Sequence, residues 1–249
     1  CPLSCHGKEY KRYNFFHFGW NRSWCMKQCA GKGDYILVID CDDLIVGDLV
    51  FPELTHDAYS LTYGASFTYQ RCQLFKNDPT LNFRYECALH EYPACDKKNH
   101  TIGYIKGSYC IDSRRLGSRS ADPKKYLNDA LVFEELLLES PNNDRYCFYG
   151  AQSYYDHGDK QNALRLYKKR IEIGGWYEEV FYSYYKVAMI KEALGDPWID
   201  VEKAYMDAFN YCKIRVEPLY HIANHYRLVK DYQNGYKFAK KGNGVQFPE

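Results

Sequence analysis

The sequence lacks an excess of charge of either sign, because 33 Lys and Arg residues stand against 32 Asp and Glu residues. This balance argues against a general electrostatic attraction to nucleic acid or to an anionic membrane. Long hydrophobic runs are missing as well. The richest run, Tyr35–Ile39, ends at Asp40 and is much shorter than the roughly 18 apolar residues of a membrane span. We therefore expect no nucleic-acid partner and no membrane span.

Paired cysteine motifs of the structural-zinc type are also absent, although the chain has 11 cysteines. An odd number of cysteines cannot all form disulfides within one chain. Several stand singly in apolar patterns: Cys110, Cys147 and Cys212. We interpret the cysteines mainly as small buried hydrophobic residues in a reducing, cytoplasmic compartment. The alternative is a metal site at Cys1 and Cys5, or at Cys25 and Cys29.

What the chain does have is enough apolar residues for a core, at 46% of 249 residues. Its composition changes at Ala121-Asp122-Pro123. Short β-type runs separated by Gly, Pro and Asn precede this point, and long segments with helical spacing follow it. We predict an α/β domain over residues 1–121 and an all-α domain over residues 122–249.

The first domain is predicted to contain a helix over Asn21–Ala30 that ends at the glycines of Gly31–Gly33. The continuous apolar run Tyr35–Ile39 then predicts a strand covered on both faces, as half of a parallel α/β unit. Further strands are expected along the rest of this domain: Ala58–Tyr63, Ser66–Phe75, Arg84–Leu89 and Tyr104–Ile111.

The second domain repeats, because Ala151, Ala188 and Ala223 recur after 37 and 35 residues. Each lies in an apolar helical pattern, and a small residue follows in the next helix, with four extra residues expected at Asp196–Asp200 in the middle unit. A helix–turn–helix unit of about 34 residues is similar to the tetratricopeptide repeat. The similarity covers Leu127–Lys241. An unrelated helical bundle is the alternative.

The strongest chemical signal is a group of aspartates, Asp40, Asp42 and Asp43, directly after the predicted buried strand. Ligands of open α/β sheets bind beyond the carboxyl ends of strands. Carboxylates two residues apart can face one divalent cation, and hard oxygen ligands suit Mn²⁺ or Mg²⁺. We therefore predict a metal site at Asp40 and Asp42, with a turn or capping cluster as the alternative.

With these motifs the chain resembles a family-2 glycosyltransferase of the GT-A fold. The resemblance is carried by several segments: Phe18–Ser23, Gly31–Asp43, Leu74–Asp78, Phe83–Tyr92, Ser113–Tyr126 and Arg215–Tyr220. It implies a partial GT-A domain with a Rossmann-like mixed sheet, followed by tetratricopeptide-like repeats. Because only 39 residues precede Asp40, we expect the amino-terminal strand that holds the nucleotide base to be missing.

The resemblance also implies an activity, which is metal-dependent, inverting transfer of a sugar from a nucleotide sugar to an acceptor hydroxyl. The acceptor would be a glycan, a protein or a lipid-linked molecule. Glu91 would be the general base, and His90 would join Asp40 and Asp42 at the metal. Donor-binding residues would be drawn from several segments: Asn21, Arg22, Asp40, Arg114, Arg115 and Arg119.

Each of these roles has an alternative that needs no chemistry. His90 and Glu91 can form an ordinary surface pair, with Glu91 as the partner of a nearby Arg or Lys. The arginines at 114–119 can form salt bridges at the domain boundary. The alternative function is a helical-repeat protein that binds a protein partner and carries a degenerate, inactive glycosyltransferase-like domain.

Overall fold

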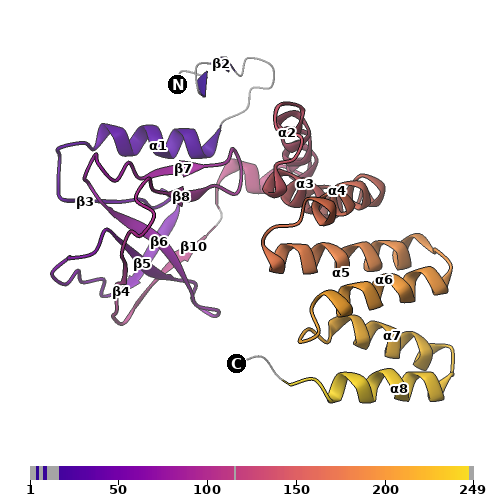
Figure 1. The fold of residues 1–249 in the computed structure, drawn as a ribbon. Helices are drawn as coiled ribbons and strands as arrows, with labels where there is room; N and C mark the ends of the chain where they lie inside the picture. The colour runs from indigo at the N-terminus through magenta and orange to yellow at the C-terminus, as the bar shows by residue number, and fades with distance from the viewer. Residues whose placement is uncertain (1–3, 6–7, 10–16, 115, 247–249) are drawn as a thin grey trace. The chain divides into compact units, whose positions relative to one another are not determined.

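The computed structural model describes residues 4–5, 8–9, 17–114 and 116–246. The chain forms two compact units, Cys1–Ala121 and Asp122–Glu249. The first contains a mixed sheet and the second is made of helices (Figure 1). This confirms the coarse prediction of a mixed sheet followed by helical repeats.

The first unit has one long helix, α1 (Phe18–Gln28), and a short 3₁₀ helix at Ser118–Ala121. Its strands are short and follow one another along the chain: β1 (Ser4–Cys5), β2 (Lys8–Glu9), β3 (Tyr35–Leu37), β4 (Asp43–Gly47), β5 (Ala58–Tyr63), β6 (Tyr69–Lys76), β7 (Arg84–Glu86), β8 (Tyr92–Ala94), β9 (Ile102–Tyr104) and β10 (Tyr109–Ser113).

The main sheet has the strand order β3-β6-β5-β10-β4, and β9 also pairs with β5. β5 runs parallel to β9 and β10 and antiparallel to β6. It lies in the middle of the sheet, and five of its six residues are buried. Leu61 and Tyr63 of this strand pack with Leu74 of β6 and Ile111 of β10. The predicted strand at Ala58–Tyr63 is therefore confirmed to the residue.

The predicted buried parallel strand at Tyr35–Ile39 is wrong in its position in the sheet. β3 covers only Tyr35–Leu37, lies at one end of the sheet order and pairs antiparallel with β6. Its residues are half-buried, and Ile39 beyond it is exposed. The physical reason is that an apolar run records hydrophobicity but not the neighbours with which a strand pairs.

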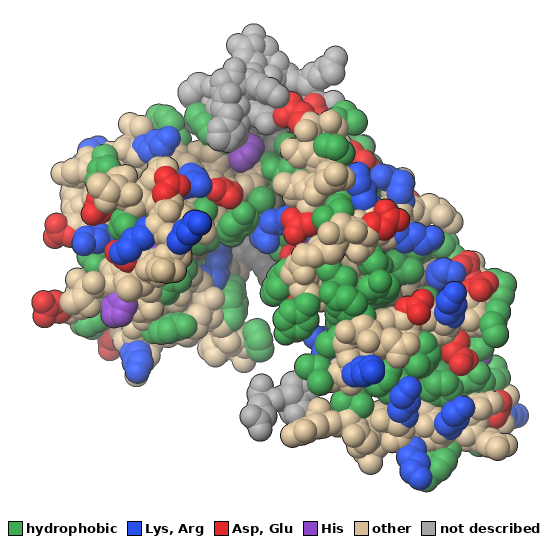
Figure 2. Space-filling model, viewed as in Figure 1, with side chains coloured by type: hydrophobic (Ala, Val, Ile, Leu, Met, Phe, Trp, Pro, Cys, Tyr) green, Lys and Arg blue, Asp and Glu red, His purple; other side chains and the backbone are tan. Residues whose placement is uncertain are grey.

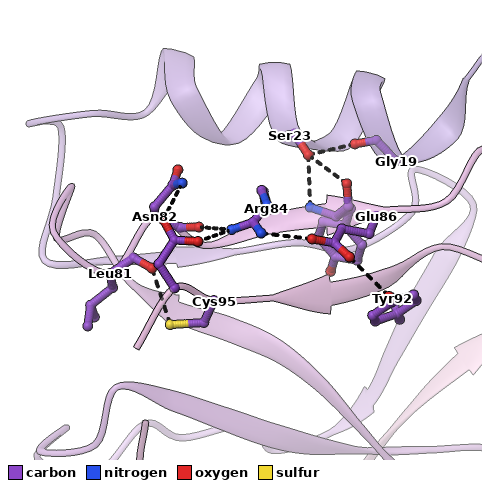
Figure 3. A network of polar contacts seen from close by, with 10 residues as sticks. Gly19, Ser23, Leu81, Asn82, Arg84, Glu86, Tyr92 and Cys95 are labelled. Carbon is purple, nitrogen blue, oxygen red and sulfur yellow. Dashed lines mark hydrogen bonds and ion pairs between the residues drawn. The ribbon is translucent and has the colours of Figure 1, made fainter. Parts of the chain in front are cut away.

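Helix α1 packs closely on β7. A Cβ atom at Gly19 would lie 2.4 Å from the carbonyl oxygen of Cys87, so glycine is what allows this approach. Ser23 Oγ lies 2.7 Å from the carbonyl oxygen of Gly19 and accepts from the N–H of Tyr85 at 2.8 Å (Figure 3). These contacts hold the helix at a fixed position over the strand.

A polar network also connects β7 with β8 and the loop that follows. Arg84 donates to Asp96 at 2.6 Å and to Glu86 at 2.8 Å, and Asn82 donates to Asp96 at 2.8 Å (Figure 3). The Tyr92 hydroxyl donates to Glu86 at 3.0 Å. The network is at the surface, so each of its ion pairs contributes little to stability.

Asp57, just before β5, is a buried carboxylate with a structural role. Its Oδ2 accepts from Lys97 Nζ and from the N–H of Thr101, both at 2.8 Å. The hydrogen bond from Lys97, followed by the one from Thr101, lowers the pKa of Asp57 to about 2. The folded state therefore favours the charged form of this carboxyl group.

We expect Asp57→Asn to destabilise the first unit at neutral pH, and the difference from wild type to vanish in acid. Because the folded pKa is lowered, the stabilisation is fully present above the unfolded value of about 3.9 and is lost as the pH falls toward 2. Urea unfolding between pH 2 and 7 measures this. An equal difference at all pH values would contradict the assignment.

The second unit consists of helices that follow one another, each in contact with the next (Figure 1). They are α2 (Lys125–Glu139), α3 (Asp144–His157), α4 (Lys160–Ile173), α5 (Tyr177–Leu194), α6 (Trp198–Tyr211), α7 (Glu217–Leu228) and α8 (Tyr232–Asn243). Three helix pairs, α3/α4, α5/α6 and α7/α8, correspond to the predicted repeats. Among the described residues, no helix is both long enough and apolar enough to cross a membrane.

The three pairs share one kind of turn. A residue with positive φ follows the first helix of each pair: Gly158 (96°), Gly195 (77°) and Lys230 (62°). An aspartate follows in every case, and its N–H donates to a carbonyl of the helix just completed. Asp159 and Asp231 then cap the next helix by accepting from the N–H three residues on. This turn chemistry is local and repeats with the sequence.

The predicted four-residue insertion in the middle repeat is wrong. Helix α4 begins after the cap Asp159, whereas α6 begins after Pro197, so the middle turn is longer by the single residue Pro197. Four residues after each cap stand Ala163, Val201 and Gly235, which are all buried. Val201 therefore occupies the repeat position that a four-residue insertion would give to the small residue Ala204. The error arose because positions 201 and 204 share one face of a helix.

Candidate functional site

Three of the predicted site residues of the first unit lie together, because Arg22 bridges Asp40 and Glu91. Arg22 Nε donates to Glu91 Oε1 at 2.7 Å, and Arg22 Nη2 donates to Asp40 Oδ1 at 2.5 Å. The exposed fractions of the Arg22 and Glu91 side chains are 16% and 14%. The guanidinium also lies over the buried ring of Tyr85, 5.6 Å from its centroid.

The charges of this cluster stabilise one another. Burial alone would lower the pKa of Arg22, but the charges of Asp40 and Glu91 outweigh it and raise that pKa above its usual value. Helix α1 positions Arg22, and the turn after β3 positions Asp40. Glu91 therefore pairs with a basic residue. This is the pairing described by the alternative interpretation, in which Glu91 is the partner of a nearby Arg or Lys and not a general base.

The other aspartates of the cluster have separate partners. Asp42 Oδ2 accepts from the N–H of Leu116, and Arg114 Nε donates to the carbonyl oxygen of Asp42, both at 2.8 Å. Asp43 Oδ1 accepts from Ser113 Oγ at 2.8 Å. These contacts anchor the segment after β10 to the start of β4.

The remaining predicted residues are dispersed. Asn21 lies next to Arg22 on α1, and Arg119 lies in the 3₁₀ helix. His90 is exposed and has a positive φ of 52°. Arg115 and Cys1 lie outside the described residues. The donor-binding assignments of these residues therefore stay predictions.

The structure gives the predicted manganese site no support. Within the described ranges, no three His, Cys, Asp or Glu side chains lie so that they could hold one metal ion together. A Mn²⁺ or Mg²⁺ cofactor at Asp40, Asp42 and His90 remains a prediction from sequence.

The cysteines are only in part the buried residues that we expected. Cys147 and Cys212 are buried free thiols, and Cys147 belongs to the largest helical core cluster. Cys25 and Cys41 are instead exposed.

Sequence reasoning missed an ion pair inside the helical unit. Arg170 is fully buried and donates to Glu179 Oε2 from Nη2 at 3.1 Å and from Nε at 3.3 Å. Its Nη1 also donates to the carbonyl oxygen of Gly174. A signal was present, because Ala163, Leu166 and Tyr167 place position 170 on the same apolar face of the helix.

A groove in the helical unit was not predicted either. It lies between α4 and α6, with α5 as its floor. Its apolar lining comes from Ile171, Tyr184, Val187 and Ala204. Its charged lining contains both signs: Lys168, Lys191, Lys203, Glu172, Asp200 and Asp207. Lys191 pairs with Asp196 at 3.2 Å.

No family model and no curated protein matches the chain. Solved structures that are similar to part of the chain include several of MamA. A crystal structure of MamA is 15% identical with a TM-score of 0.43, over 54% of this chain and 76% of that one. A second is 15% identical with a TM-score of 0.42, over 52% and 69%. A third, of MamA MSR-1, is 14% identical with a TM-score of 0.39, over 52% and 80%.

These findings contradict the glycosyltransferase prediction. No family model and no curated protein matches the chain, and the three solved structures described above are of MamA. The predicted family and the predicted enzymatic sugar transfer are therefore contradicted, and the GT-A fold of the first unit is not confirmed. The nucleotide-sugar donor and the acceptor are unsupported. Glu91, the expected general base, and Asp40, an expected metal ligand, are both paired with Arg22.

Proposed function

We propose that the helical unit binds a peptide segment of a partner protein in the groove between α4 and α6. The observation that carries this proposal is the lining of the groove, with apolar side chains beside charges of both signs. Apolar side chains supply the affinity for an anchor residue of the peptide, and the charges select its neighbours.

The helical repeats suit this role. Stacked helix pairs form extended surfaces that bind other chains. Hydrophobic side chains lie beside charged side chains of both signs on the face of this unit shown in Figure 2. Lys168 and Lys203 are exposed, and neither forms an ion pair with another described residue. They are available to carboxylates of a bound peptide.

A peptide selection tests the proposal. Random 12-residue peptides displayed on phage are selected on the full chain, and enriched peptides are resynthesised with a fluorescent label. We expect an aliphatic or aromatic residue flanked by Asp or Glu. The double variant Lys168→Glu, Lys203→Glu should bind such peptides about tenfold more weakly, because two attractive contacts become repulsive.

The matched control is Lys213→Glu, Lys240→Glu, which changes two exposed lysines outside the groove by the same charge. It should bind as wild type does. Failure to enrich any peptide, or equal weakening by both double variants, would show that the groove is not the binding site.

A further inference from the structure

The edge strand β4 of the first unit carries a second binding feature, separate from the groove. β4 lies at one end of the strand order and, in the described part of the chain, pairs only with β10 (Figure 1). An edge strand of this kind exposes backbone N–H and C=O groups that can pair with another chain.

The hydrogen bonds identify which backbone groups are free. Ile45 stands opposite Ile111 of β10, and the Ile111 carbonyl accepts from Gly64 N–H on the other side. Residues of an antiparallel pair alternate between facing their partner and facing away. Because Ile111 faces away from β4, Ile45 also faces away from β10. Its N–H and C=O therefore point out of the sheet edge.

The side chains of β4 are apolar on both faces. The exposed fractions of Leu44, Ile45 and Val46 are 46%, 39% and 46%. Consecutive residues of a strand point to opposite faces, so neither face of β4 is covered. Natural edge strands commonly carry Lys or Pro that prevents pairing, and β4 has neither.

Acidic residues flank this apolar strand at both ends. Asp42 and Asp43 stand at its beginning and Asp48 directly after it. Within the described residues, none of these carboxylates forms an ion pair with a Lys or Arg side chain. A strand that pairs with β4 therefore meets an apolar centre with carboxylates at both ends, and the Arg114 guanidinium lies beside Asp42 at one of them.

This charge pattern disfavours a second copy of the chain as the occupant. Antiparallel pairing of two β4 strands about Ile45 would place Asp42 of one copy opposite Asp48 of the other. Like charges directly opposite one another destabilise a strand pair.

We propose that β4 binds an extended segment of another protein by strand addition, and that this segment has apolar residues flanked by Lys or Arg. Backbone hydrogen bonds to Ile45 supply the pairing. The apolar side chains cover Leu44, Ile45 and Val46, and the basic residues neutralise the aspartates. This site is independent of the groove in the helical unit.

The probe is a fluorescent peptide of alternating Val and Thr residues with a Lys at each end, measured by anisotropy on the full chain. A peptide with Glu at each end tests charge, and a version with N-methylated Val residues tests backbone pairing. We expect the Lys-ended peptide to bind at least about tenfold more tightly than either control. Equal binding of the Lys-ended and N-methylated peptides would overturn the proposal.

Two variants locate the site. Ile45→Pro removes the outward N–H but keeps the pairing with β10, since proline is tolerated on the free side of an edge strand. It should reduce binding about tenfold, whereas Ile45→Thr should not. Asp48→Lys should weaken binding of the Lys-ended peptide about fivefold and strengthen binding of the Glu-ended peptide.

The remaining outcomes are also decisive. If circular dichroism shows that Ile45→Pro does not fold, the shift of preference toward the Glu-ended peptide in Asp48→Lys decides alone. The groove variant Lys168→Glu, Lys203→Glu should bind the Lys-ended peptide as wild type does. If light scattering shows that wild type forms a dimer and that Ile45→Pro does not, the occupant of β4 is a second copy of the chain and not a segment of another protein.

Discussion

Replacing Arg170 by methionine is expected to lower the free energy of unfolding of the helical unit by about 3–5 kcal/mol. Methionine replaces the aliphatic part of the buried side chain but leaves the Glu179 carboxylate without its main partner. That carboxylate is also buried, and Arg170 donates two hydrogen bonds to it. Urea unfolding of the full chain, followed by circular dichroism at 222 nm, measures the loss.

The matched control is Arg165→Met, on the same helix. Arg165 pairs with Glu134, but half of its side chain is exposed, so its loss should cost about 1 kcal/mol or less. The double variant Arg170→Met, Glu179→Leu should recover most of the stability, because apolar replacements of a buried ion pair are often neutral. A single Arg170 variant as stable as the Arg165 control would refute the interpretation.

Replacing Arg22 by methionine is expected to destabilise the first unit by about 3 kcal/mol, since it leaves Glu91 largely buried and unpaired. Asp40, which is more exposed, contributes less to the loss. Hydrogen exchange followed by mass spectrometry should show faster exchange in α1 and β7, which meet at Gly19 and Ser23. Helix α8 should exchange at the wild-type rate.

Arg84→Met serves as the control within the same unit. Arg84 also bridges two carboxylates, but about a third of its side chain is exposed, so the cost should be about 1 kcal/mol or less. Arg22→Lys should fall between wild type and Arg22→Met, because lysine keeps the charge but cannot contact both carboxylates with a planar group. Equal stability of Arg22→Met and Arg84→Met would show that burial adds nothing to the Arg22 contacts.

The helical repeats could be predicted because their signals are local. The apolar period places Ala151 and Ala188 on the buried face of α3 and α5. Gly158-Asp159 and Gly195-Asp196 form the turns that their residue types favour. The register of the middle repeat was not predictable, because Val201 and Ala204 both fit the buried face of α6. Only the residue at which α6 begins, Trp198, distinguishes them.

The candidate site of the first unit could be predicted only as a set of residues. The sequence identified Arg22, Asp40 and Glu91 as charged residues in notable positions. It could not show that one guanidinium contacts both carboxylates, since Arg22 and Glu91 are 69 residues apart. The chemistry assigned to these residues came from the resemblance to a glycosyltransferase family, which the comparisons contradict, and the role of each residue stays a prediction.

The sequence by itself determined that the second unit is helical, that turns fall at Gly158-Asp159 and Gly195-Asp196, and that Ala58–Tyr63 forms a strand. The periods of hydrophobicity and the preferences of turn residues act over a few neighbouring positions, so they can be recognised in the local sequence. Only the tertiary structure decided that β3 and β4 are edge strands and that Arg170 is buried with Glu179. Pairing and burial depend on residues far apart in the chain, and the free energy of a charge depends on which partner the fold brings to it.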